Sequence, residues 1–192
     1  MKTFVKSSLL VLATALASSA MAQETAEQAS EEFPIGTKPE IKVGQVYLVE
    51  TKGDWNVRCM KTAEGDDPCH IHQVLKDERG NSVAEISFFH LPGGGAAVAG
   101  ATATTPLGTL LQAQLTFKID ESPAKQYPFN WCEAVGCISR MGFTGLELEL
   151  LKKGSNASVT IASVVSPTQP VTVPVSLTGF SDGFRAVLVK PK

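Results

Sequence analysis

Short runs of β-branched, aromatic and alternating apolar residues recur along most of the chain, separated by Gly, Pro, Asn and Asp. In the run 55–59, Trp, Val and Cys alternate with polar residues, which is the period of a half-buried β-strand. We expect an all-β fold, a β-sandwich of about eight or nine strands with one or two short helices, because turn signals recur at sandwich spacing. The predicted strands are 46–49, 55–59, 69–74, 82–91, 107–119, 127–132, 137–143, 158–165 and 171–177.

Two segments are predicted as helices. Thr144 and Glu147 fit a capping box, in which each side chain accepts a hydrogen bond from the other residue's backbone N–H. Gly154 then ends the helix after two lysines. The leucines within 146–150 also alternate, so a strand is the alternative to this helix. The second segment, 182–189, is expected to form a short closing helix despite its glycine.

The aromatic residues have structural interpretations first. Phe88 and Phe89 should place one ring on each face of their strand, and the outward ring is a candidate for a partner-binding patch. Trp55 and Trp131 each lie near a cysteine and are predicted to pack on disulfides rather than to form a ligand platform. The Gly- and Ala-rich segment 93–103 is predicted to be a long loop.

Residues 1–22 have the pattern of a secretory signal peptide. Two lysines open the chain, a short apolar run follows at 9–17, and Ala20-Met21-Ala22 is a small-x-small cleavage site. The apolar run is well short of the roughly 20 residues that span a bilayer. We therefore expect export, cleavage, a mature chain that starts near Gln23, and no transmembrane segment after cleavage.

The rest of the chain is predicted to be an acidic leader followed by one domain. The segment 23–40 is rich in Glu, Ala, Gln and Ser, and reads as a flexible leader. The segment 41–192 is long enough for a single disulfide-stapled β-sandwich domain. Without the two lysines of residues 1–22, 15 basic and 19 acidic residues remain, a formal net charge of −4. This balance gives no support for a nucleic-acid partner or for attraction to an anionic membrane surface.

The four cysteines are predicted to form two disulfides, because an exported protein folds in an oxidising compartment. Three pairings are possible. We favour the two local ones, Cys59–Cys69 and Cys132–Cys137, because turn residues lie between the members of each pair. Loops this short should each contribute about 2–3 kcal/mol on the chain-entropy description.

A metal site is the main alternative that the residues themselves suggest. His70 and His72 would project from one face of a strand, as two metal ligands can. A third ligand could come from His90, or from Asp66 and Asp67. No third ligand stands at a fixed spacing, however, so a solvated strand face is favoured and no metal or other cofactor is predicted. The alternative function is a periplasmic small-molecule or metal-binding protein that uses the His70/His72 face.

The chain is predicted not to be an enzyme. Ser122 and Lys125 match a Ser-x-x-Lys pattern, but the Ser-Asp-Asn and Lys-Thr-Gly elements of enzymes with that pattern are missing from the sequence. Pro123 indicates a turn there. The sequence also has no Gly-x-Ser-x-Gly nucleophile elbow, and Cys132 and Cys137 lie too far apart for a Cys-x-x-Cys redox pair.

An ordered set of short motifs resembles the invasion-associated locus B family. The similarity runs from about residue 45 to 188 and includes both cysteine pairs. The motifs are Trp55–Cys59, Cys69 with Gln73, Pro106-Leu107-Gly108, Pro128–Cys132 leading into Gly136-Cys137, Leu150–Gly154 and Val173–Phe180.

This resemblance implies a small exported protein, mostly β, of Gram-negative α-proteobacteria. Members in some pathogens are linked to virulence through invasion of host cells such as erythrocytes. The family has no established catalytic residues, so none can be assigned here. We therefore expect a non-catalytic interaction protein whose partner is a protein in the envelope or on a host cell. Its expected location is the periplasm, with the outer membrane or cell surface left open, as is the oligomeric state.

Overall fold

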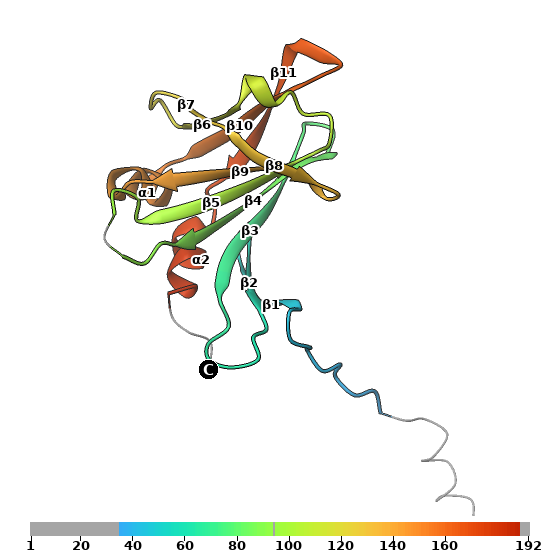
Figure 1. Ribbon diagram of the computed structural model, residues 1–192. Helices are drawn as coiled ribbons and strands as arrows, with labels where there is room; N and C mark the ends of the chain where they lie inside the picture. Colours follow the sequence, from blue (N-terminus) through green and yellow to red (C-terminus); the bar gives the residue numbers. More distant parts are fainter. Residues whose placement is uncertain (1–34, 94, 189–192) are drawn as a thin grey trace, which may run out of the picture. The chain divides into compact units, whose positions relative to one another are not determined.

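The computed structural model describes residues 35–93 and 95–188 (Figure 1). The chain divides into two units, one up to Glu40 and one from Ile41. Of the first unit only 35–40 are described, and they form an exposed segment without helix or strand. The predicted signal peptide, 1–22, and most of the predicted leader lie outside the described residues.

The second unit is a β-sandwich of two antiparallel sheets with two short α-helices, as predicted from the sequence. One sheet has seven strands in the order β1-β2-β3-β4-β5-β9-β8, and the other has four in the order β11-β10-β6-β7. In Figure 1 the hairpin of β10 and β11 leads to one end of this unit. Helix α2 lies beside β2 and β3, away from that end. The elements are β1 Val46–Lys52, β2 Trp55–Met60, β3 Cys69–Lys76, β4 Ser82–His90, β5 Ala99–Thr105, a 3₁₀ helix Leu111–Ala113, β6 Leu115–Ile119, β7 Lys125–Tyr127, β8 Phe129–Glu133, β9 Gly136–Phe143, α1 Gly145–Lys153, β10 Asn156–Ser163, β11 Ser166–Ser176 and α2 Phe180–Ala186.

The described residues form eleven strands rather than eight or nine. One additional strand is β5, where a Gly- and Ala-rich loop was expected over 93–103. Its alanines at 99, 101 and 103 are all buried, and Ala101 pairs directly with Phe88 of β4. Small side chains in the centre of the sheet leave room for this large ring, which explains how a strand without large apolar residues can lie in the core.

The other difference arises where predicted strands are shorter or divided. In the predicted strand 107–119, only β6 is extended, because a turn and the 3₁₀ helix occupy its first part. The predicted strand 127–132 is divided at Pro128, so that β7 joins the four-stranded sheet and β8 the seven-stranded one. Proline lacks a backbone N–H and weakens a ladder at its position, and the chain passes from one sheet to the other at Pro128.

Both predicted helices are present, but the buried leucines of α1 and the first residue of α2 differ from the prediction. Glu147 N–H donates to Thr144 Oγ1 at 3.3 Å, and Thr144 N–H donates to Glu147 Oε2 at 3.0 Å, which is the predicted capping box. The strand alternative for this segment is therefore wrong. The buried leucines of α1 are Leu148 and Leu151, whereas Leu146 is exposed. α2 begins at Phe180, two residues before the predicted start.

A cluster of aromatic rings fills the core between the sheets. Trp55 packs edge-on against Phe88 and Phe180, with ring centroids 5.7 and 5.3 Å away. Phe117 and Phe143 extend the cluster toward the four-stranded sheet. Trp55 therefore lies in the aromatic core, and Trp131 on edge strand β8 is about half exposed. The described contacts of Trp55 are with aromatic rings, and its packing on a disulfide, like that of Trp131, stays a prediction.

A buried glutamine joins the two sheets. Gln73 of β3 accepts a hydrogen bond from Ser176 N–H at 2.9 Å and donates to Ser176 O and Asp54 O, both at 3.3 Å. Trp55 Nε1 donates to the same Ser176 carbonyl at 2.8 Å. The polar atoms of both buried side chains are satisfied, so the junction of β3 and β11 is tightly specified.

Candidate functional site

The structure contains both favoured disulfides. Cys59 and Cys69 are directly opposite each other in the β2–β3 ladder, with Cα atoms 4.1 Å apart. Cys132 and Cys137 are opposite each other in the β8–β9 hairpin, with Cα atoms 4.0 Å apart. No cysteine among the described residues is free. Each bond links the two strands of one hairpin, so each stabilises that hairpin within the seven-stranded sheet.

Asp67 organises the loop that the first disulfide closes, a role that the sequence reasoning missed. Its carboxylate accepts hydrogen bonds from the backbone N–H and hydroxyl of Thr62, and from the Tyr47 hydroxyl at 2.8 Å. Lys61 Nζ lies 3.3 Å away. The Thr62 N–H, and then the Tyr47 hydroxyl, hold the pKa of Asp67 well below its usual range. Asp67 is thus a structural residue rather than a free metal ligand.

The three histidines do not converge on a site. His70 and His72 share the outer face of the seven-stranded sheet, where His72 Nε2 lies 3.1 Å from Glu85 Oε2. His90 belongs to the opposite face, where its Nε2 lies 3.0 Å from the Phe184 carbonyl. Among residues 35–93 and 95–188, no three His, Cys, Asp or Glu side chains group in a way that could hold a metal ion. The structure gives no support to the metal-binding alternative.

We expect the folded state to become less stable as the pH falls below about 6.5. Burial lowers the pKa of both His72 and His70 below the usual 6.5, more than Glu85 compensates at His72. Between pH 5 and 7 the unfolded chain therefore binds more protons than the folded chain, so the free energy of unfolding decreases with decreasing pH. Thermal melts at pH 7 and pH 5 should show this decrease, and His72→Gln should reduce it. An equal decrease in that variant would contradict the assignment to His72.

The Ser-x-x-Lys pattern does not form a catalytic pair. Lys125 Nζ forms an ion pair of 2.5 Å with Glu147 Oε1. This partner raises the pKa of Lys125, whereas a lysine that activates a serine needs a lowered one. Ser122 lies in the turn between β6 and β7, as Pro123 indicated.

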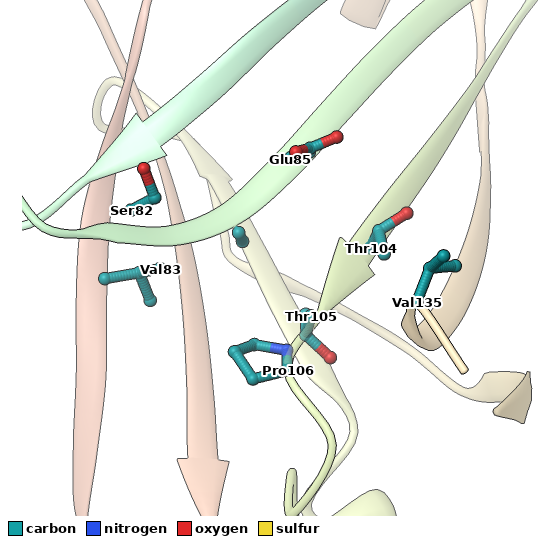
Figure 2. A pocket seen from close by; sticks show the side chains of 8 residues that line it. Ser82, Val83, Glu85, Thr104, Thr105, Pro106 and Val135 are labelled. Atoms are coloured by element: carbon teal, nitrogen blue, oxygen red, sulfur yellow. The ribbon is translucent and has the colours of Figure 1, made fainter. Parts of the chain in front are cut away.

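A pocket of about 540 Å³ lies where β4 and β5 meet the β8–β9 turn (Figure 2). Its polar side chains are Ser82, Glu85, Thr104 and Thr105. Glu85 is bonded to His72 Nε2, and the Thr105 hydroxyl is bonded to Cys137 O and to the Thr109 hydroxyl. These groups can hydrogen-bond a ligand but do not form a nucleophile–base pair. The full lining is Ser82, Val83, Ala84, Glu85, Thr104, Thr105, Pro106 and Val135.

A second pocket, of about 310 Å³, lies on the outer face of the same sheet. Phe89 points to this face while Phe88 is buried in the core, as predicted for the pair. Gly100 lies beside Phe89, so close that a Cβ on Gly100 would be 2.6 Å from the ring. Arg140 lines the pocket too, and its backbone N–H donates to Asn130 Oδ1 at 2.8 Å. Arg140 was missed because only the register places it beside β4 and β5.

The edge strand β1 presents a third surface. Val46 and Leu48 are exposed on one face of β1, and Met60, the partner of Val46 in β2, is exposed beside them. As the first strand of its sheet, β1 has a neighbour on one side only. Such an edge can pair with an extended segment of another protein. Edge strand β11 instead carries Pro167, Pro170 and Pro174, which interrupt such pairing.

These features define a class of protein, a small disulfide-linked β-sandwich with two surface pockets and an exposed edge strand, and without an assembled catalytic set among its described residues. No helix in the described part of the chain is both long and apolar enough to cross a membrane. The chain belongs to the Invasion associated locus B (IalB) protein family, whose sequence profile matches residues 55–188.

Two relatives resemble the chain in sequence, and one solved structure resembles it in fold. The Invasion protein B homologs of Brucella abortus strain 2308 and of Brucella abortus biovar 1 (strain 9-941) are each 29% identical over 138 residues, covering 71% of this chain and 77% of theirs. The crystal structure of invasion associated protein B from Bartonella henselae superposes with a TM-score of 0.63 at 23% identity. The superposition covers 74% of this chain and 95% of the Bartonella henselae chain, so the two share the fold.

Proposed function

We propose that this protein is an exported, non-catalytic interaction protein of the bacterial envelope that contributes to virulence through host-cell association or invasion. Its membership of the family over residues 55–188 carries the proposal, because its curated relatives are named invasion proteins. Residues 1–22 act as a signal peptide in this account, and 23–40 as an acidic leader before the β-sandwich. The expected location is the periplasm or the outer surface of the cell.

The chemistry of the surface supports binding rather than catalysis. Glu85, which lines the first pocket, is hydrogen-bonded to His72, and Lys125 of the Ser-x-x-Lys pattern is paired with Glu147. The exposed edge of β1 favours an extended segment of a protein partner, because it combines free backbone groups with the apolar side chains of Val46 and Leu48.

A complementation experiment tests this function. Deleting the gene should reduce bacterial entry into host cells, and the full-length chain should restore it. The chain without residues 1–22 should not restore it, because it stays in the cytoplasm. Leu48→Lys should restore entry less well than the matched control Leu146→Lys, which changes an exposed leucine of α1. Normal entry by the deletion strain would contradict the proposed role.

Non-reducing peptide mapping of the protein from the envelope fraction should find the linkages 59–69 and 132–137. The same chain made in the cytoplasm without residues 1–22 should have reduced cysteines, since that compartment keeps thiols reduced. Free cysteines in the envelope sample would contradict export, and crossed pairs would contradict the hairpin registers of β2–β3 and β8–β9.

A further inference from the structure

Four aliphatic side chains project from two turns at one end of the β-sandwich. They lie in the turn after β5 and in the β10–β11 turn, which Figure 1 places at the same end of the unit. We call them the apolar tip. Their exposed fractions are 62% for Leu107, 41% for Leu111, 54% for Val164 and 84% for Val165.

The two turns are bonded to each other, so the tip is one surface. Leu110 N–H donates to Ala162 O at 2.8 Å, and Val164 N–H donates to Gly108 O at 2.9 Å. A further β-bridge joins Thr109 to Ser163. The backbone therefore holds together the two turns that carry the aliphatic side chains.

The tip stands on two long segments without charge. The sequence has no Asp, Glu, Lys or Arg from Ile86 to Phe117 or from Gly154 to Ser181. Charged residues are 19% of the chain as a whole, whereas the two turns that form the tip carry none. An uncharged aliphatic surface is complementary to hydrocarbon, in which charged side chains are costly.

The backbone of the tip is also suited to a medium without water. The N–H groups of Leu110 and Val164 are bonded across the two turns, Thr109 N–H donates to Pro106 O, and Val165 N–H donates to Ser163 Oγ. Lipid surroundings offer no partners for backbone groups, so internal bonding of this kind lowers the cost of insertion.

A protein partner is less well matched to this tip. The residues that dominate binding energy in protein interfaces are enriched in Trp, Tyr and Arg. The turns 106–111 and 163–166 contain none of these.

From the exposed aliphatic side chains, the lack of charge and the bonded backbone, we infer that the apolar tip inserts into the interfacial layer of a lipid bilayer. This contact goes beyond the proposed host-cell role and does not depend on it.

Nearby charges indicate which lipids should bind. Ser82, at the start of β4, lines the same pocket as Pro106. The β3–β4 turn just before Ser82 carries Asp77, Glu78 and Arg79. A turn of mixed sign provides no attraction to anionic headgroups. Binding should therefore be similar on neutral phosphatidylcholine vesicles and on vesicles with added phosphatidylglycerol, and should change little with salt.

Vesicle co-sedimentation tests the inference. The chain without residues 1–22 is used, because that apolar segment would bind lipid by itself. We expect it to sediment with phosphatidylcholine vesicles, and Leu107→Ser with Val165→Ser to lower the partition coefficient at least tenfold. Leu146→Ser is the matched control, because Leu146 is 75% exposed but lies on α1. It should bind like the parent chain, and all three proteins should have similar melting temperatures.

A depth measurement gives a second readout. In Val165→Trp, the new indole should shift its emission to shorter wavelength on adding vesicles and be quenched by lipids brominated in their acyl chains. Absence of sedimentation, or equal binding by the tip variant, would overturn lipid insertion. A dimer that forms without vesicles and is lost in the tip variant would overturn it in favour of a second copy as the occupant.

Discussion

Trp55→Ala should lower the free energy of unfolding by about 3–5 kcal/mol, the cost typical of removing a buried large aromatic side chain. Trp55 is fully buried and contacts Phe88 and Phe180 in the aromatic core between the sheets. Loss of the indole N–H matters less, because Ser176 O keeps its hydrogen bond from Gln73. The cavity therefore accounts for most of the effect. Urea denaturation, followed by circular dichroism, measures it.

The matched control is Trp131→Ala. Trp131 is exposed on edge strand β8, so its removal should change the free energy of unfolding by less than about 1 kcal/mol. Similar effects at both positions would contradict the placement of Trp55 at the centre of the core.

Gly179→Ala should destabilise the protein by about 2–5 kcal/mol. Gly179 has a φ of +82°, and moving an L-residue into that region costs about 1–2 kcal/mol. The added Cβ would also lie 2.1 Å from Lys52 O in the β1–β2 turn, where overpacking adds about 1–3 kcal/mol. The clashing atom is backbone, so the β1–β2 turn and α2 must move apart. Urea denaturation again measures the loss.

Gly80 provides a control that separates the two contributions. Its φ is +84°, nearly the same as that of Gly179, but a Cβ there would have nothing within 4 Å. Gly80→Ala should therefore cost only about 1–2 kcal/mol. Equal losses in the two variants would show that the close approach of the turn at Gly179 to Lys52 is absent in solution.

Sequence periodicity predicted the sandwich and most strands, because alternating residues such as those of β2 report directly on burial. It failed at β5, where Ala99, Ala101 and Ala103 are buried opposite a large ring. Small residues give no hydrophobic signal of their own, and their role depends on Phe88 in the neighbouring strand. It also failed around Pro128, because a change of sheet depends on tertiary packing.

In the candidate sites too, contacts between residues close in sequence could be predicted, and contacts that depend on strand register could not. The two disulfides could be predicted because both partners of each are close in sequence. The bond of His72 to Glu85 could not, since only the register of β3 and β4 brings these side chains together. The capping box at Thr144 signalled α1 because its interactions span a single turn.

Protease accessibility tests most directly whether this family member works outside the cytoplasm. Trypsin would be added to intact cells, to cells with a permeabilised outer membrane and to lysed cells, with periplasmic and cytoplasmic marker proteins followed in parallel. Cleavage in intact cells would place the protein where it can contact a host directly, and cleavage only after permeabilisation would place it in the periplasm. We expect cleavage in one of these two states while the cytoplasmic marker survives. Cleavage only after lysis, together with that marker, would contradict this expectation.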